Sequence, residues 1–240
     1  MKTDSYLRIY FMLQPSTLKF LTDLVQNNNR EWFLENRKRY DDSKADLEKL
    51  VGTLITEVGK FHDLGNLQVK DCIFRINRDV RFSKNKDPYK SNLSAGIGPG
   101  GRSSGRVDYY LHIQPNGQSF LGGGMWDATA EQLAKYRQEV DYNADELKSI
   151  IHEKEFREYY PEISGESLKT APKGYPKDHP EIELLRRKQL FFVHRFSDKD
   201  VTSKGFADSI VKGMKLLKPY TDFMNYILYD ANPEAEDIQL

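Results

Sequence analysis

The spacing of hydrophobic residues changes twice along this chain, and this change restricts the possible folds more than any other feature. Up to Phe61 the apolar residues recur every three or four positions, which is typical of helices. Between residues 72 and 123 they form short runs with the alternation of strands, and helical spacing returns after Asp127. Helices on both sides of a strand-rich stretch predict an α+β fold with an antiparallel sheet, rather than a doubly wound parallel sheet.

The N-terminal helices have clear sequence boundaries. Pro15-Ser16-Thr17 is a helix-start signal, and the asparagines at 27–29 are expected to end this helix and cap a short one over 30–36. The strongest periodicity of the chain then runs from Leu47 to Phe61 and predicts a long helix.

The middle and the C-terminal half predict one sheet covered by N-terminal and C-terminal helices. Strands are expected at residues 72–76 and 93–97, and a β-hairpin at 108–114 and 119–123 around Pro115-Asn116-Gly117. The remaining expected elements are helices over 127–140 (capped by Asp127 or Thr129) and 144–159, a polar loop over 164–179, a short helix through 184–185, a strand over 190–196 and a final helix from Ser203.

Length and cysteine content bound the class of protein. The 240 residues suit one large domain, predicted at 12–230, with an extension at 1–11 and an acidic, flexible tail at 231–240. The only cysteine, Cys72, excludes an internal disulfide and fits a reducing compartment. No apolar run is long enough to span a membrane, and no signal peptide is evident. These features predict a cytoplasmic protein without membrane contact, while the oligomeric state stays open.

Charge is balanced overall but uneven along the chain. The formal net charge is zero, which argues against strong binding to nucleic acid. Residues 70–106 nevertheless carry nine Lys and Arg against three Asp, whereas residues 127–166 carry eleven Asp and Glu against five basic residues. Any electrostatic binding site is therefore expected within the basic segment.

The basic segment concentrates the chemistry. If residues 72–77 form a strand, Arg75 and Asn77 share one face, and the chain leaves that strand as a loop rich in Arg and Lys. Guanidinium groups suit carboxylate or phosphate ligands. The alternative is structural, because Asp79 and Asp87 can pair with the arginines.

The same segment resembles a known family. The stretch Phe74-Arg75-Ile76-Asn77-Arg78-Asp79-Val80-Arg81-Phe82-Ser83, followed by Lys86-Asp87-Pro88-Tyr89-Lys90, is similar to the hallmark of the conserved hypothetical proteins named domain of unknown function 2461. Three further stretches agree: Asn28-Asn29-Arg30-Glu31-Trp32-Phe33 with Asn36, Arg39 and Tyr40; Tyr109 to Trp126; and Gly174 to Lys188. The resemblance covers Met12 to Tyr226. It implies one domain and brings no activity, and the glycines at 98–105 depart from its usual pattern.

We expect these polar and aromatic stretches to line a common cleft. The predicted lining residues are Arg75, Arg78, Arg81, Lys90, Tyr110, His112, Trp126, His179 and Arg187. The best hypothesis is a binding site for a small anionic ligand, including phosphorylated ones. An enzyme using the same cleft, with His179 or Asp79 in proton transfer, is the alternative, and a nucleic-acid module is a weaker one.

Other motifs carry less weight, and the sequence leaves any cofactor unknown. Gly96-Ile97-Gly98-Pro99-Gly100-Gly101 matches a dinucleotide-binding spacing but does not open a helix. The five histidines form no metal-binding pair in sequence. Gly122-Gly123-Gly124 is expected either to turn the chain out of the hairpin or to let another backbone approach closely.

Overall fold

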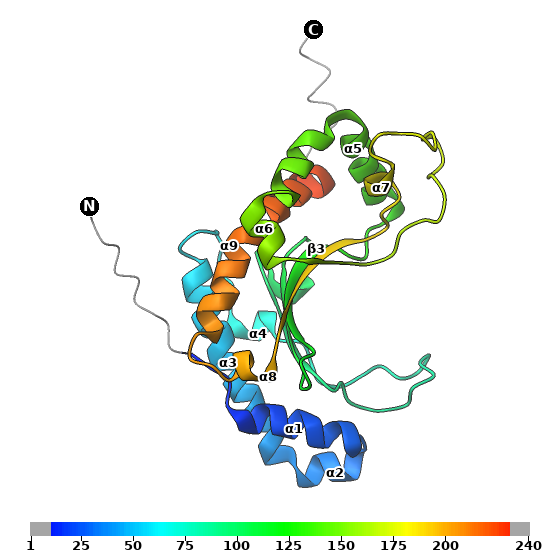
Figure 1. The fold of residues 1–240 in the computed structure, drawn as a ribbon. Coiled ribbons are helices and arrows are strands. Elements are labelled where there is room, and N and C mark those ends of the chain that lie inside the picture. Colours follow the sequence, from blue (N-terminus) through cyan, green and yellow to red (C-terminus); the bar gives the residue numbers. More distant parts are fainter. Residues whose placement is uncertain (1–10, 231–240) are drawn as a thin grey trace, which may run out of the picture. The chain divides into compact units, whose positions relative to one another are not determined.

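The computed structural model describes residues 11–230 and confirms the α+β fold (Figure 1). The extension predicted at 1–11 lies outside the described residues except for its last residue, and the predicted acidic tail at 231–240 lies outside them entirely. The described chain contains nine α-helices and one five-stranded antiparallel sheet with strand order β1-β2-β3-β5-β4. No helix in this part of the chain is long and apolar enough to cross a membrane.

The elements follow the order that the sequence predicts, with three additions and without the strand expected at 72–76. The strands are β1 (Leu93–Ile97), β2 (Tyr109–Ile113), β3 (Ser119–Met125), β4 (Glu162–Ser164) and β5 (Leu190–Phe196). The α-helices are α1 (Pro15–Gln26), α2 (Arg30–Glu35), α3 (Arg37–Val58), α4 (Val69–Cys72), α5 (Ala130–Ile151), α6 (Lys154–Tyr159), α7 (Ile182–Leu185), α8 (Asp198–Val201) and α9 (Phe206–Asn225). A 3₁₀ turn, η1 (Gly101–Ser103), and a π-helical turn, η2 (Tyr226–Asp230), complete the list. The three additions, which the sequence does not predict, are α4, α8 and β4.

The described chain divides into two compact units. Unit 1 contains residues 11–104, 109–121 and 195–215, and unit 2 contains 105–108, 122–194 and 216–230. The boundaries fall inside β3, β5 and α9, so each unit is assembled from separate stretches of chain. The predicted single domain at 12–230 stays a prediction.

In unit 1, the first helices form as predicted. Pro15 occupies the first turn of α1, where its missing N–H costs nothing, and Leu18, Leu21 and Leu24 are buried along one side. The Asn29 side chain accepts a hydrogen bond from the Trp32 N–H and caps α2. Helix α3 packs against both α1 and β1.

Strands β1 and β2 give unit 1 a sheet with two different faces. They pair antiparallel, with Ser94 opposite His112. Along β2, Tyr109, Leu111 and Ile113 are fully buried, while Tyr110 and His112 are only partly covered. The period of two therefore places the polar and aromatic side chains of β2 together on the less covered face.

The predicted hairpin turn between β2 and β3 is confirmed. Asn116 and Gly117 both have a positive φ, of 64° and 68°, which is the backbone conformation that two-residue hairpin turns require. Their N–H groups donate to the Asp198 carboxylate, at 3.0 and 2.9 Å.

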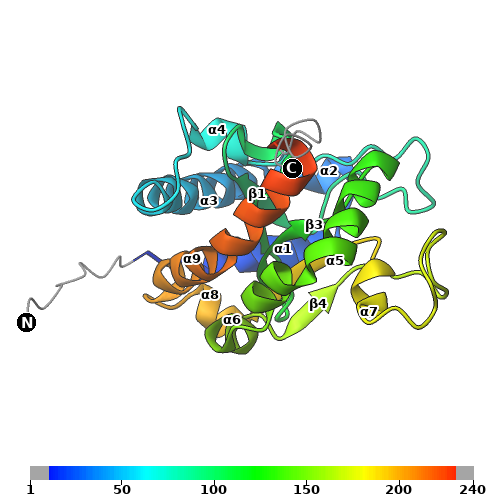
Figure 2. The same cartoon turned by 90° about the horizontal axis from the view of Figure 1, so that it is seen from above.

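The helices of unit 2 follow the sequence prediction up to one interruption. Asn143 has non-helical backbone angles inside α5, at the gap between the helices expected at 127–140 and 144–159. The second expected helix is interrupted, because α5 ends at Ile151 and the short α6 begins at Lys154. Thr129 caps α5 through a capping box with Gln132. Figure 2 shows α7 beside α5, where the Tyr136 hydroxyl donates to the Leu184 carbonyl at 3.1 Å.

The prediction of a strand at 72–76 is wrong. Cys72, buried as predicted, ends the single helical turn α4, which a capping box between Gln68 and Asp71 begins. Beyond it, the described chain forms only isolated bridges, from Ile73 to Ala95 and from Asn77 to Tyr89. The alternation of side chains is preserved, since Ile76 is buried and Arg75 exposed, yet the ladder that would make a strand is missing.

The three glycines of β3 allow close backbone approach within unit 2. A Cβ atom at Gly124 would lie 2.2 Å from the Leu190 carbonyl oxygen, and one at Gly122 would lie 2.6 Å from the Phe192 carbonyl oxygen. Because the chain continues as a strand to Met125, these glycines do not turn it out of the hairpin. The second of the two predicted roles is therefore confirmed.

Candidate functional site

The residues that the sequence singles out divide between the two units. Those in unit 1 are Arg75, Arg78, Asp79, Arg81, Lys90, Tyr110 and His112, and those in unit 2 are Trp126, His179 and Arg187. Each group is described by itself, and the convergence of all of them on a common cleft stays a prediction.

Residues 76–90 form a two-armed excursion that leaves the sheet and returns to it (the teal loop in Figure 1). The two arms are joined by backbone hydrogen bonds from the Lys90 N–H to the Ile76 carbonyl (2.8 Å) and from the Arg78 N–H to the Pro88 carbonyl (2.9 Å). Near the tip, the Phe82 side chain is 95% exposed. Most of the basic residues of the predicted motif therefore lie on one loop, whose arms are held together by backbone hydrogen bonds.

Three basic side chains of this excursion bond to other residues of the same excursion and so stabilise its fold. The Arg78 guanidinium donates to the Asp87 carbonyl (3.2 Å) and to the Ser83 hydroxyl (3.3 Å). Arg81 forms an exposed ion pair with Asp79 at 2.7 Å, and its hydrogen bonds lower the pKa of the Asp79 carboxyl. The Lys86 ammonium donates to the Val80 carbonyl at 3.0 Å.

Two of the stretches that resemble the family meet at Tyr89. The Asn28 side-chain amide donates to the Tyr89 carbonyl (2.9 Å) and accepts from the Tyr89 N–H (3.1 Å), so it pairs with this backbone as a strand would. The Tyr89 ring stacks on Phe33 with ring centres 3.9 Å apart. The start of α2 thereby fixes the excursion next to Lys90.

Lys90 differs from the other basic residues of the excursion. Its side chain is partly buried, and its ammonium lies 5.5 Å from the centre of the Phe74 ring. Burial, with a smaller effect of the Arg75 charge, lowers the pKa of Lys90. Neither Lys90 nor Arg75 forms a side-chain hydrogen bond or an ion pair with any residue between 11 and 230.

A chain of hydrogen-bonding side chains crosses the less covered sheet face. The ring of His112 contacts the Gln114 side-chain carbonyl through Nε2 (2.8 Å) and the Tyr110 hydroxyl through Nδ1 (3.3 Å). Because an amide oxygen can only accept, Nε2 carries the hydrogen and Nδ1 accepts from Tyr110. The buried Ser94 hydroxyl lowers the pKa of Tyr110.

Burial dominates the electrostatics of these two rings. It raises the pKa of Tyr110, against a smaller opposite effect of the Ser94 hydrogen bond. It lowers the pKa of His112, and the positive charges of Arg195 and Lys90 lower it further, while the Gln114 hydrogen bond acts in the opposite direction. His112 is therefore neutral at pH 7.

We name this group the sheet-face cluster: Phe74, Lys90, Tyr110, His112, Gln114 and Phe120. Phe120 of β3 stacks on His112 with ring centres 4.7 Å apart, and Phe74 meets Tyr110 edge-on at 5.9 Å. The sequence prediction includes Lys90, Tyr110 and His112 but misses the other three. Gln114 shares the alternation of Tyr110 and His112, and this signal is sufficient to place it on the same face.

In unit 2, the predicted residues have internal partners. Nδ1 of His179 accepts from the Glu181 N–H (3.0 Å), and Nε2 lies 2.9 Å from the Asp141 carboxylate, so both ring nitrogens are engaged. Trp126 is 46% exposed and meets Phe191 edge-on at 5.4 Å. Arg187 forms a backbone bridge with Ser167.

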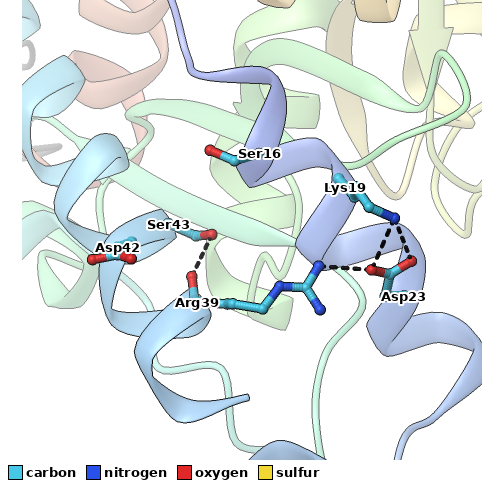
Figure 3. A pocket seen from close by; sticks show the side chains of 6 residues that line it. All are labelled: Ser16, Lys19, Asp23, Arg39, Asp42 and Ser43. Atoms are coloured by element: carbon cyan, nitrogen blue, oxygen red, sulfur yellow. Dashed lines mark hydrogen bonds and ion pairs between the residues drawn. The ribbon is translucent and has the colours of Figure 1, made fainter.

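A surface pocket of about 280 Å³ lies between α1 and α3 in unit 1 (Figure 3). Its lining residues are Ser16, Lys19, Asp23, Arg39, Asp42 and Ser43. Arg39 pairs with Asp23 at 2.6 Å and lowers the pKa of that carboxyl, and Lys19 adds a second contact at 3.2 Å. Because Asp23 forms ion pairs with both Arg39 and Lys19, we interpret the pocket as part of the packing between α1 and α3 rather than as a ligand site.

Comparison with known proteins identifies a family without assigning a function. Among residues 11–230, no group of three or more His, Cys, Asp or Glu side chains is placed to hold a metal ion. No curated protein and no solved structure matches the chain significantly. A family model described as "Conserved hypothetical protein (DUF2461)" matches residues 16–223. The chain therefore belongs to the conserved hypothetical protein family DUF2461.

Proposed function

We propose that this protein binds a small anionic ligand with phosphate- or carboxylate-type oxygens on the sheet-face cluster. The observation that carries the proposal is Lys90, a partly buried ammonium without a carboxylate partner among the described residues. A charge withdrawn from water is destabilising unless an opposite charge or hydrogen bonds compensate it. An anion beside Lys90 supplies that compensation.

The surroundings of Lys90 support an anion rather than a cation. The charge of Arg75 lowers the pKa of Lys90, and the charges of Arg195 and Lys90 lower the pKa of His112, so the charges that act on these two groups are positive. Tyr110 and His112 add polar groups, and the rings of Phe74 and Phe120 add flat apolar surface. Such a combination of few polar groups and aromatic surface is typical of small-molecule sites.

The enzyme alternative receives less support. His179 uses both ring nitrogens internally, and the pKa of Asp79 is lowered by Arg81, which makes it a weaker base. Binding is therefore the function we propose, and we place the protein in the cytoplasm, because its single cysteine suits a reducing compartment.

The proposal is tested by thermal unfolding of the purified protein with inorganic phosphate, pyrophosphate and citrate. The variant K90M removes the charge, and K84M is the matched control, because Lys84 is an exposed lysine of the same excursion. A ligand at about 100 times its Kd stabilises a protein of this size by about 2.7 kcal/mol, or raises its Tm by about 5 °C or more.

We expect such a shift in wild type and K84M, and its loss in a folded K90M variant. Stabilisation that persists unchanged in K90M would place the anion elsewhere. The absence of any stabilisation by these three anions, at concentrations up to tens of millimolar, would refute the proposal for this class of ligand.

A further inference from the structure

We propose that His112 makes this site selective for dianions: it is neutral when the site is empty and takes up a proton when an anion binds beside Lys90. This inference rests on the proposed function, because it specifies which anions the sheet-face cluster prefers. It is carried by the hydrogen-bond geometry around His112 and by the sign of the charges that face it.

The two charged groups that act on the pKa of His112 are both positive. Lys90 belongs to the excursion, and Arg195 lies near the end of β5, in the part of that strand that belongs to unit 1. The other neighbours are uncharged at pH 7: Ser94 of β1, Tyr110 and Gln114 beside it, and Phe120 of β3. Burial first, and these two positive charges second, keep the ring unprotonated in the empty site, where no described carboxylate opposes them.

The hydrogen-bond chain allows His112 to gain a proton without moving any heavy atom. In the neutral state, the Tyr110 hydroxyl donates to Nδ1 of His112. After protonation Nδ1 donates to the Tyr110 oxygen, and the Tyr110 hydrogen turns toward Ser94 or the bound ligand. Gln114 accepts from Nε2 in both states. Protonation therefore reverses the chain and gives the site one more donor.

A bound anion reverses the electrostatic balance. It screens the Lys90 charge from His112 and adds a negative charge nearby, and both effects favour the protonated ring. Lys90 together with protonated His112 offers two positive charges. A dianion, such as a phosphate monoester or sulfate, neutralises both, whereas a monoanion neutralises only one. The site is thus expected to bind dianions with uptake of a proton.

The test is an NMR titration of the histidine rings with sulfate as the probe, since sulfate does not change its own charge between pH 5 and 8. The chain has five histidines, and H112Q assigns the His112 signal. We expect sulfate to move the His112 titration midpoint to higher pH. The affinity for sulfate then falls by about tenfold per pH unit between the two midpoints.

Nitrate provides the monoanion comparison and is expected to move the midpoint less than sulfate. The H112Q variant, whose amide can still donate and accept, is expected to bind sulfate with an affinity that no longer depends on pH in this range. Sulfate binding that requires Lys90 but leaves the His112 midpoint unchanged would overturn this inference and leave the proposed function intact. If sulfate, phosphate, pyrophosphate and citrate all fail to bind at any pH, the proposed function itself is refuted.

Discussion

Lys90 and Lys86 lie four residues apart on one excursion, but their charges meet different surroundings. The Lys86 ammonium donates to a backbone carbonyl near the tip. The Lys90 ammonium instead lies over the Phe74 ring, and no carboxylate among the described residues pairs with it. The sequence predicts a basic segment and leaves both the structural and the binding interpretation open. It cannot separate the two, because which lysine is buried depends on contacts with residues distant in sequence.

Asn28 is one of those distant residues, and it provides a prediction at this scale. The variant N28A removes two hydrogen bonds to the Tyr89 backbone and leaves a part-buried N–H and carbonyl without that partner. We expect a loss of about 1–3 kcal/mol in the free energy of unfolding. Because Tyr89 precedes Lys90, anion binding is expected to weaken as well. Urea unfolding and the thermal-shift measurement check these effects.

The control for this variant is N85A, which removes an amide from the exposed tip of the excursion. It is expected to change the free energy of unfolding by less than about 0.5 kcal/mol and to leave binding intact. If N28A is as stable as N85A, the Asn28 contact does not hold the excursion.

At the scale of elements, long periodic segments could be predicted and short ones could not. The bounds of α1 and β1 and the hairpin turn follow from local signals such as Pro15 and Asn116-Gly117. The three-residue strand β4 exists only through its pairing with β5, which no local pattern reveals. For α8 a local signal was present, since Ser197 and Asp200 form a capping box, but one turn of helix has no hydrophobic period.

The glycines of β3 provide a prediction at this scale. Gly124 has φ of 146°, and an added Cβ would lie 2.2 Å from the Leu190 carbonyl oxygen and 2.8 Å from the Phe191 Cα. Because backbone atoms cannot move aside like the end of a flexible side chain, G124A is expected to destabilise the protein by about 3 kcal/mol or more. Chemical denaturation measures this loss.

Gly205 offers the matched control, since an added Cβ there meets no atom within 4 Å and its φ is not positive. The variant G205A is expected to alter the free energy of unfolding by less than about 0.5 kcal/mol. Equal effects of the two substitutions would show that the close approach of β3 to Leu190 is relaxed at little cost.

At the scale of the whole molecule, the two units are interleaved in sequence. Unit 1 and unit 2 are each built from three stretches of the described chain, and the divisions fall inside β3, β5 and α9. Neither unit can therefore complete its structure from one continuous segment. The sequence predicts a single domain over 12–230, and this arrangement predicts that both units unfold together.

Calorimetry tests this prediction directly. We expect one transition with a calorimetric enthalpy equal to the van't Hoff enthalpy, since a two-state domain unfolds without intermediates. The same variants identify any independent unit: N28A acts in unit 1 and G124A in unit 2. Two transitions, each shifted by only one of these variants, would contradict the single-domain prediction.

The most direct test of the central claim is to locate a heavy oxyanion on the protein. Crystals of wild type and K90M grown with tungstate, and measured by anomalous diffraction at the tungsten edge, would show where a dianion is held. We predict a peak beside the Lys90 ammonium, within hydrogen-bonding distance of the sheet-face cluster in wild type and absent from K90M. Tungstate bound only at other positions, or beside residue 90 equally in both proteins, would contradict anion binding through Lys90.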